Sequence, residues 1–399
     1  MYIVHICPRI KEVHGGGEPV LYHLTRELCE LGHNNAVLTM RIPHSQRSLF
    51  DKRIIIKEIP ALWKEDSGNL LITGFLELCC MSVMAAKIPK EADAICFHTE
   101  ATIFPLFFYK VFGGRKPCLY FCYQPPRFAY DLQKDMAKHG KRVSLILPIF
   151  NAIYRPFDKL AVRLSDKTAT FSNGYKQWIE SIYGIKDVVV LAPGVERLVT
   201  PVALPRKMAL TLSKPGIKII LSVGKLVAWK NVDRLINITS LLKKRIPSVC
   251  LLVVGGGPCM DSLRKQAAAA NLLENNDVVF AGYVSHNDIF AYYNKADLLV
   301  LLEKNASFGL SLIEANATGL PVIAYKGGGP SDIIEEGKNG FLLPNDYTDK
   351  EIANSITNFL LSSDAKIKEI SNYSKSLSEK YTWKRFAENF IQTIAELRK

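Results

Sequence analysis

Residues 296–321 read ADLLVLLEKNASFGLSLIEANATGLP, and this stretch decides the fold class. The apolar run Asp297–Leu302 has the length and composition of a buried strand. Phe308 and Gly309 then form a turn, and Leu310–Thr318 has the pattern of a short helix closed by a glycine. A buried strand that leads through a turn into a helix is typical of α/β domains with a parallel sheet.

The same turn predicts a phosphate site. Backbone amides in the first turn of a helix have no partner within the helix, and together with the helix dipole they attract an anion. Glu314 lies one turn into this helix, where its carboxylate can accept two hydrogen bonds from the vicinal hydroxyls of a ribose. The alternative is an ordinary strand and helix in which Gly309 only allows close packing.

Strands alternate with helices through both halves of the chain, which indicates parallel sheets covered on both faces. The predicted strands are Tyr2–Cys7, Ala36–Met40, Ile54–Lys57, Ala94–Phe97, Cys118–Cys122, Thr168–Phe171, Val188–Leu191, Lys218–Val223, Cys250–Val254, Val278–Phe280, Asp297–Leu302 and Val322–Tyr325. Helices are expected at Val20–Leu31, Val232–Leu242, Leu310–Thr318 and Tyr381–Leu397.

The pattern breaks between residues 192 and 216, where five prolines and glycines interrupt a segment with weak periodicity. We therefore expect a first doubly wound domain over residues 1–192, a linker over 193–216 and a second such domain over 217–380. The two domains would face each other across a cleft, with ligands at the carboxyl ends of the strands.

Several loops after these predicted strands have residues suited to a ligand. Gly15, Gly16 and Gly17 open the first helix, where backbone must approach a ligand or another loop closely. Lys225 and Lys230 follow Gly224, so two cations can clamp a diphosphate. Gly257 with Pro258, and Tyr283 with Val284, lie on two more loops at the same sheet edge, where exposed backbone groups can read a base. The alternatives are a flexible turn and solvated surface lysines.

In order and spacing, seven such motifs together resemble the retaining GT-B glycosyltransferases of family 4. They are Gly15-Gly16-Gly17-Glu18, Gly224-Lys225-Leu226 with Lys230, Gly255-Gly256-Gly257-Pro258, Gly282-Tyr283-Val284, Phe308-Gly309 with Glu314-Ala315, Gly319-Leu320-Pro321-Val322, and Gly328-Gly329-Pro330 with Gly337 and Gly340-Phe341. The resemblance implies two Rossmann-like domains, with the nucleotide sugar bound mainly by the second and the acceptor mainly by the first. It also implies a C-terminal helix, at about residues 381–399, that crosses back to the first domain through Trp383 and Phe386.

By the same resemblance, Lys225 and Lys230 would neutralise the departing diphosphate, Glu314 would hold the ribose, and Gly309 and Leu310 would bring amides to the phosphate. The chain departs from the family where a second glutamate is usual, because that position is Ala306. Glu303 lies on the same loop, three residues out of register. Lys225 stands where arginine is more frequent, which keeps the charge and loses the bidentate fork.

The first domain offers two further candidates. Asp93–His98 resembles the family's strand that ends in a histidine facing the donor sugar, so His98 would bond sugar hydroxyls or the acceptor, although a lone histidine is often structural. The proline-containing loop after Cys122 suits acceptor recognition, and its candidate side chains are Tyr123, Gln124, Arg127 and Tyr130.

The chemistry needs an anionic leaving group to be stabilised, which two lysines and a helix N-terminus can do without a metal. The sequence has no Asp-x-Asp pair, so we expect no metal and no cofactor beyond the nucleotide-diphosphate sugar, linked to UDP or GDP, as donor substrate. Without an evident protein nucleophile, retention would follow a front-face route in which the leaving phosphate accepts the acceptor proton.

The chain has 399 residues and a net charge of +13, which favours an anionic partner. Nine cysteines without zinc spacing fit a reducing cytoplasm, and the N-terminus has no signal-peptide pattern. The apolar stretch Leu70–Ala86 contains Glu77 and is expected to be a core helix. Residues 134–167 mix basic and apolar side chains, which suits peripheral docking on anionic lipid, or else a helix pair on the first domain.

The sequence therefore favours a transferase that moves a hexosyl group to a glycan or lipid-linked saccharide. The alternatives are a weakened partner subunit that binds nucleotide or glycan, which only Ala306 favours, and a nucleotide-sugar epimerase of the same fold. Binding to nucleic acid is suggested by charge alone, since no binding motif accompanies it, and we expect no nucleic-acid partner.

Overall fold

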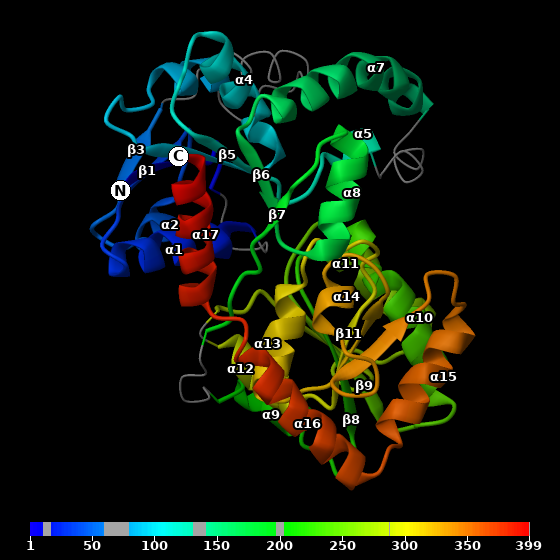
Figure 1. Ribbon diagram of the computed structural model, residues 1–399. Coiled ribbons are helices and arrows are strands. Elements are labelled where there is room, and N and C mark those ends of the chain that lie inside the picture. Colours follow the sequence, from blue (N-terminus) through cyan, green and yellow to red (C-terminus); the bar gives the residue numbers. More distant parts are fainter. Residues whose placement is uncertain (11–16, 60–79, 131–140, 197–202, 287, 399) are drawn as a thin grey trace. The chain divides into compact units, whose positions relative to one another are not determined.

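The computed structural model describes residues 1–10, 17–59, 80–130, 141–196, 203–286 and 288–398. These residues form two compact units (Figure 1). Unit 1 contains the described residues up to 192 together with 384–398, and unit 2 contains those from 193 to 383. Within the described residues, the chain passes from unit 1 to unit 2 after residue 192 and returns to unit 1 at residue 384.

Unit 1 is built on a seven-stranded parallel sheet in the order β3-β2-β1-β4-β5-β6-β7. Each strand is a short apolar run, and β1, β4 and β5 in the centre are almost wholly buried, as expected for strands covered on both faces. Their bounds are β1 Tyr2–Ile6, β2 Asn34–Thr39, β3 Ile55–Glu58, β4 Ala94–His98, β5 Cys118–Phe121, β6 Lys167–Thr170 and β7 Val189–Val190.

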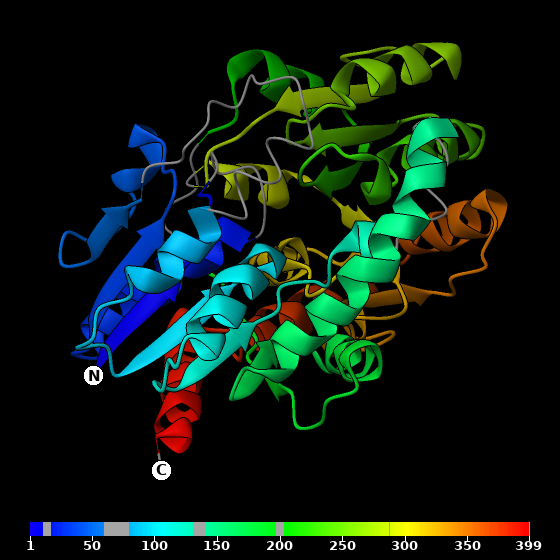
Figure 2. The same ribbon diagram turned by 90° about the horizontal axis from the view of Figure 1, so that it is seen from above.

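Helices cover both faces of this sheet. On one face, α4, α7 and α8 pack against Val4, Ile6 and Phe97, and α7 runs beside α4 (Figure 2). The other face carries α1 and α17, and Phe390 of α17 stacks on the ring of His5 at 5.9 Å. The helices are α1 Gly17–Glu30, α2 His44–Arg47, α4 Ile103–Val111, α5 Arg127–Tyr130, α7 Lys141–Arg163, α8 Asn173–Tyr183 and α17 Trp383–Leu397, with a 3-10 turn at Glu100–Thr102.

Unit 2 has a six-stranded parallel sheet in the order β10-β9-β8-β11-β12-β13. The chain order reverses direction between β8 and β11, so their carboxyl ends lie at the switch point where doubly wound sheets bind ligands. The strands are β8 Lys218–Val223, β9 Val249–Val254, β10 Val278–Gly282, β11 Leu298–Leu301, β12 Val322–Tyr325 and β13 Gly340–Leu343.

The helices of unit 2 also form two layers. The buried residues of α10, α11 and α15 share one core with Ile220, Leu251 and Ile323 of the sheet. Helices α12 and α13 contact β8, β11 and β12, and α16 packs on α13. The helices are α9 Arg206–Thr211, α10 Val232–Lys243, α11 Met260–Ala269, α12 Ile289–Lys295, α13 Leu310–Thr318, α14 Pro330–Ile333, α15 Asp349–Leu360 and α16 Asp364–Ser378, with a 3-10 turn at Ala228–Lys230.

Both sheets are parallel and covered by helices, so the predicted α/β doubly wound class is confirmed. All twelve predicted strands are present to within a few residues. The sequence did not predict strand β13, and α9 forms a helix inside the segment expected to be a linker. Helix α7 is a single helix of 23 residues that contains Pro148 and Pro156, where a helix pair was the alternative.

The apolar stretch at residues 70–86 falls partly outside the described residues, and the part that is described, 80–86, is helical. Among the helices in the described ranges, none combines the length and apolar character that crossing a bilayer requires.

Candidate functional site

In unit 2, the loops that carry the predicted donor-binding residues lie at one edge of the sheet. They follow β8, β9, β10 and β11, which are neighbours in the sheet, and parallel strands place their carboxyl ends together. Backbone hydrogen bonds join the loops, since the Leu226 amide donates to the Gly256 carbonyl (2.9 Å) and the Gly255 amide donates to the Gly282 carbonyl (2.8 Å). The predicted residues Gly224, Lys225, Lys230, Gly257, Pro258, Tyr283, Val284, Phe308, Gly309 and Leu310 all lie on these loops or directly after them.

Two of the glycines on these loops are required by close backbone approaches. A Cβ atom at Gly255 would lie 1.9 Å from the Gly224 carbonyl oxygen, and φ there is +135°. A Cβ at Gly257 would lie 2.4 Å from the Leu226 carbonyl oxygen. The loops after β8 and β9 therefore touch through backbone, which requires glycine at both positions.

Lys230 is held at this edge by a carboxylate. Its ammonium forms a short ion pair with the largely buried Glu303, which follows β11. The Asn231 side-chain amide donates to the Leu302 carbonyl (2.7 Å), so a second contact fixes the β8 loop against the β11 loop. Lys225 is exposed on the same loop. The structure thus places both predicted cations on one loop and pairs Lys230 with Glu303.

The first turn of α13 supplies amides for an anion. Its N-cap is Gly309 in the left-handed region (φ +101°), and among the described residues no side chain caps this end. Phe308 is buried next to it and makes an edge contact with Tyr381. The N-terminus of α13 thus has the features of a phosphate-binding turn.

Glu314 lies one turn along α13 and is partly buried. The buried Tyr293 hydroxyl of α12 donates to Glu314 Oε2 at 2.5 Å. Burial raises the pKa of Glu314, while His286 and the Tyr293 hydrogen bond oppose the rise. Nearby, His286 Nε2 lies 3.3 Å from Glu196 Oε2.

Ala306, where the family usually has glutamate, is buried on the same loop as Glu303. The Gly329 amide donates to its carbonyl at 2.9 Å, and a Cβ at Gly328 would lie 2.2 Å from that oxygen. This backbone contact ties the β11 loop to the β12 loop whatever the side chain at position 306.

In unit 1, His98 is fully buried at the end of β4 with both ring nitrogens engaged. Nε2 lies 2.9 Å from His5 Nδ1, and Nδ1 lies 2.9 Å from the Tyr123 hydroxyl. His5 Nε2 in turn lies 3.3 Å from Asn35 Oδ1. Burial lowers the pKa of His5 to about 4 and that of His98 well below its usual value, with His5 adding to the shift at His98. Both imidazoles are neutral at pH 7.

A cavity of about 70 Å³ lies in unit 1 beside Tyr123. A Cβ at Gly17, the first residue of α1, would lie 3.1 Å from Cδ2 of Tyr123, so the glycine lets the helix start directly against the ring. Gly16 lies outside the described residues. The cavity is lined by Cys7, Arg9, Ile10, Gly17, Glu18, Leu21, Tyr22, Gln46, Phe50, Thr99 and Tyr123.

The predicted acceptor-binding residues do not gather at this cavity. Tyr123 lines it, whereas the Tyr130 hydroxyl donates to Asp158 of α7 at 2.8 Å. Arg127 is buried on α5, and Gln124 is partly buried before it. Asp158 is fully buried, and burial raises its pKa to about 6 against the opposing Tyr130 hydrogen bond.

One group in unit 1 has the atom types and distances that a metal ion requires. Ligating atoms of His5, Cys96 and His98 all lie within 4.8 Å of one another and are buried. The facing nitrogens of the two histidines are already hydrogen-bonded to each other, and burial raises the pKa of the Cys96 thiol well above its usual value. These features favour a hydrogen-bond network here over a thiolate metal site.

The sequence reasoning missed His5, Asn35 and Tyr293. His5 and Asn35 contact His98 and its network from strands 93 and 63 residues away in sequence, a proximity that no local pattern reveals. The available signal was a polar residue inside an apolar strand: His5 interrupts the run Tyr2–Cys7 and is completely buried. A buried polar side chain requires a hydrogen-bond partner, so such residues mark networks.

The chain is similar to known glycosyltransferases in sequence. Residues 207–377 match the family model Glycosyl transferases group 1, and residues 14–197 match the model Glycosyltransferase Family 4. A 2-deoxystreptamine N-acetyl-D-glucosaminyltransferase of Niallia circulans is 26% identical over 339 residues, which are 82% of this chain and 84% of that protein.

Two solved structures share the fold over nearly the whole chain. Sucrose-phosphate synthase from Thermosynechococcus elongatus has a TM-score of 0.78 at 19% identity and covers 99% of this chain and 98% of its own. Anabaena HepE in complex with UDP and glucose has a TM-score of 0.73 at 18% identity, and the match covers 99% of this chain and 100% of that structure. With two family models that together span most of its length, the chain belongs to the family 4, group 1 glycosyltransferases and has their GT-B fold of two Rossmann-like domains.

Proposed function

We propose that this glycosyltransferase moves a hexosyl group from a nucleotide-diphosphate sugar to a glycan or lipid-linked saccharide, with retention of anomeric configuration and without a metal. The donor assignment rests on the edge of unit 2. There Lys230 follows β8, and α13 after β11 offers Glu314 and an N-terminus that no side chain of the described residues caps. Lys225 and Lys230 would neutralise the diphosphate, the α13 amides would bind a phosphate, and Glu314 would hold the ribose. The solved HepE complex with UDP and glucose supports this reading.

In this proposal the bond between the anomeric carbon and the phosphate oxygen breaks first as the lysines and amides stabilise the departing charge. The acceptor hydroxyl forms its bond to the anomeric carbon on the same face. Its proton passes to the leaving phosphate oxygen, so the protein supplies positioning and electrostatics rather than a nucleophile.

Nucleotide binding is the first test. A thermal-shift panel of UDP, GDP, ADP and their sugars identifies the donor, because a ligand of the native state raises the melting temperature by mass action. Lys230→Ala removes a charge-assisted contact worth about 1.5–3 kcal/mol, so the Kd of the preferred nucleotide rises roughly 10- to 100-fold. Lys326→Ala, which removes an exposed lysine after β12, is the matched control and leaves Kd unchanged. No nucleotide-dependent shift for the wild type would refute the donor site.

Product analysis tests the reaction itself. NMR of the anomeric proton of the product reports the configuration of the new linkage, and we expect it to be retained. We also expect the transfer rate to be the same with and without EDTA. An inverted product would refute the front-face route, and a rate abolished by EDTA and restored by a divalent ion would refute metal independence.

The second candidate is a partner subunit with weakened catalysis, which Ala306 favours because a carboxylate is missing where the family usually has one. If that carboxylate limits turnover, Ala306→Glu raises kcat several-fold while Ala306→Gln does not, since only the glutamate adds charge. Ala306 is buried, so the melting temperature of both variants is measured alongside. Nucleotide binding without transfer by the wild type would favour the partner subunit.

We further propose that α7 docks the enzyme peripherally on an anionic membrane at the cytoplasmic face, where lipid-linked acceptors would be reached. Ile149, Ile153 and Leu160 are 69%, 75% and 50% exposed, and with the exposed Pro156 they follow helical spacing as one apolar stripe. The apolar stripe of α7 would insert into the membrane surface. The chain has a net charge of +13, and its basic groups would attract the anionic headgroups.

Vesicle flotation tests this surface. The wild type floats with vesicles that contain phosphatidylglycerol and does not float with pure phosphatidylcholine, and raised salt weakens binding. Ile149→Ser combined with Ile153→Ser abolishes flotation, whereas Leu361→Ser, which removes an exposed leucine of unit 2, does not. Equal flotation of the α7 variant and the wild type would refute the assignment.

A further inference from the structure

Four buried polar side chains form a continuous line through unit 1. Asn35 of β2 contacts His5 of β1, His5 contacts His98 of β4, and His98 contacts Tyr123 beyond β5. The three contacts measure 3.3, 2.9 and 2.9 Å. The two ends differ in surroundings, because Asn35 is enclosed by backbone and Tyr123 lines the cavity.

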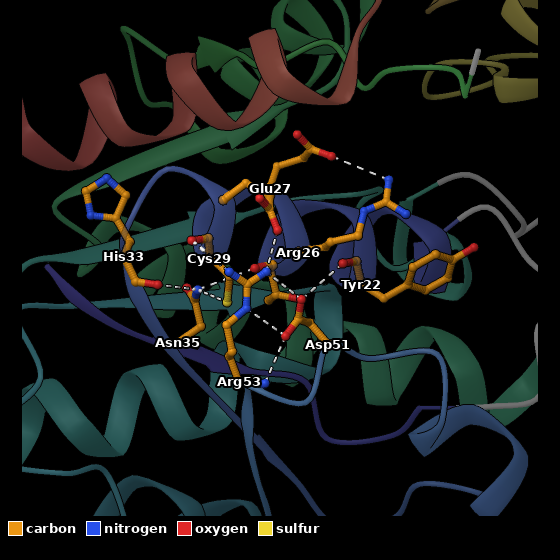
Figure 3. Close-up of polar contacts among 10 residues, drawn as sticks. Tyr22, Arg26, Glu27, Cys29, His33, Asn35, Asp51 and Arg53 are labelled. Atoms are coloured by element: carbon orange, nitrogen blue, oxygen red, sulfur yellow. Dashed lines mark hydrogen bonds and ion pairs between the residues drawn. The ribbon is translucent and has the colours of Figure 1, made fainter.

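The orientation of the Asn35 amide is fixed by its neighbours. Its Nδ2 donates to the His33 carbonyl (3.1 Å) and lies 3.4 Å from both the Thr25 carbonyl and the Cys29 sulfur, and Figure 3 shows it between His33 and Cys29. A reversed amide would set its oxygen against two carbonyl oxygens and leave no donor for either. Oδ1 therefore faces His5 and can only accept a hydrogen bond.

This orientation determines the tautomer of each histidine. A neutral imidazole has one N–H donor and one acceptor nitrogen. His5 must carry its proton on Nε2 to donate to Asn35, so His5 Nδ1 accepts from Nε2–H of His98. His98 Nδ1 then accepts, and the Tyr123 hydroxyl must donate to it. The lowered pKa of both imidazoles, caused mainly by burial, excludes a second proton at pH 7.

The chain of bonds leaves the Tyr123 oxygen as an acceptor only. Its single proton is used on His98, so toward any ligand group that reaches it the oxygen can only accept a hydrogen bond. Other polar side chains of both kinds line the cavity, among them the Glu18 carboxylate and the Arg9 guanidinium. A cavity of about 70 Å³ admits a group the size of a hydroxymethyl. At Tyr123 itself, therefore, the direction of the bonds selects a ligand group that donates a hydrogen bond.

We propose that Tyr123 recognises a hydroxyl of the saccharide acceptor as a hydrogen-bond donor, and that Asn35 and His5 are positioning residues that set the direction of the bonds reaching Tyr123. The acceptor identity rests on the function proposed above, whereas the direction of the bonds does not. On this account His98 acts on the ligand through Tyr123 rather than by direct contact.

The first test reads the tautomers directly. The full chain is labelled with 15N-histidine, and two-bond nitrogen–proton correlations are assigned with His5→Gln and His98→Gln. We expect both residues as neutral Nε2–H tautomers from pH 8 down to about pH 5. His98 observed as the Nδ1–H tautomer, or as imidazolium at pH 7, overturns the proposal whatever the enzyme transfers.

The second test uses methyl α-D-glucoside and its monodeoxyfluoro derivatives as probes, with binding followed at the His98 resonances. Fluorine accepts but does not donate, so one derivative should bind the wild type roughly two- to tenfold more weakly than the glucoside. Tyr123→Phe removes that difference. Tyr120→Phe, which removes a phenol buried among apolar residues of β5, keeps it. No response to the glucoside, or equal binding of all derivatives, overturns the assignment of the cavity to a sugar hydroxyl.

A third variant separates positioning from contact. Asn35→Leu removes the fixed acceptor and frees His5 to adopt the other tautomer, which reverses the bonds and lets Tyr123 donate to the ligand. The fluorine penalty should then disappear while UDP binding at unit 2 is unchanged. If the variant retains the penalty, Asn35 does not set the direction. If this variant fails to fold, the tautomers observed in the wild type still determine whether the proposed direction of the hydrogen bonds is correct.

Discussion

At the scale of single residues, Glu314 shows how a buried contact prepares a carboxylate for a ligand. Tyr293 occupies one carboxylate oxygen with a 2.5 Å hydrogen bond and so fixes the rotamer of Glu314. Burial raises the pKa of Glu314, because charge is disfavoured away from water, and the tyrosine offsets part of that rise. Tyr293 thus holds the Glu314 carboxylate in one position.

We expect Glu314→Gln to weaken UDP binding by about tenfold, since a neutral amide accepts weaker hydrogen bonds from the ribose than a carboxylate does. The same substitution should hardly affect 2′,3′-dideoxy-UDP, which lacks both hydroxyls. Calorimetric titration of UDP and of the dideoxy nucleotide into the wild type and the variant measures the coupling between Glu314 and the ribose hydroxyls. An equal loss for UDP and the dideoxy nucleotide would place Glu314 away from the ribose.

At the scale of elements, the packing of the loops after β8 and β9 requires glycine at position 255 but not at position 256. Gly255→Ala would drive a Cβ to 1.9 Å from the Gly224 carbonyl oxygen at φ +135°, whereas a Cβ at Gly256 meets nothing within 4 Å. We expect Gly255→Ala to lower the melting temperature by several degrees and to abolish the UDP-dependent shift. Gly256→Ala should change neither. Equal behaviour of the two variants would contradict the close approach of these loops.

A second prediction at this scale concerns the packing of α5 on α7. Asp158 of α7 is fully buried, and its pKa is raised to about 6 from 3.8, mainly by burial. Between pH 4 and 6 the folded state therefore binds more protons than the unfolded state, so stability falls as pH rises through this window. The loss is about 3 kcal/mol and is complete above pH 6.

Asp158→Asn removes this penalty and keeps an acceptor for Tyr130. We expect the variant to be more stable than the wild type at pH 8, by up to about 3 kcal/mol, and the difference to vanish near pH 4. Scanning calorimetry from pH 4 to 8 measures it. Asp187→Asn, which changes an exposed aspartate of the same unit, is the control and should show no such trend. A pH-independent difference for Asp158→Asn would refute the raised pKa.

The elements also show what could be predicted from the sequence. Long apolar runs such as Lys218–Val223 were placed correctly, because buried parallel strands require them. Strand β13 was missed because it is a short strand at the sheet edge with half-buried residues, so it lacks that composition. The Lys230–Glu303 pair and the line from Asn35 to Tyr123 join side chains on different strands or on the loops that follow them. Such contacts depend on register and packing, which a local pattern does not contain.

At the scale of the whole molecule, the chain closes its fold with a helix far in sequence from the sheet it covers. Residues 384–398 follow unit 2 but belong to unit 1. Phe386 lies against Phe121 with ring centroids 6.0 Å apart, and Arg398 pairs with Asp93 at 3.0 Å. The core of unit 1 therefore requires the last residues of the chain.

This arrangement predicts that a core substitution in α17 destabilises unit 1 and not the nucleotide site of unit 2. Phe390 is fully buried against His5, so Phe390→Ala should cost about 3–5 kcal/mol. In scanning calorimetry we expect the transition of unit 1 to fall by roughly 6–20 °C. The transition that UDP raises should respond as in the wild type, because the residues proposed to bind UDP lie in unit 2. Glu388→Ala, an exposed position on the same helix, should leave both transitions in place. If Phe390→Ala removes the UDP response, the units do not fold independently, and α17 then couples the stability of the nucleotide site to the core of unit 1.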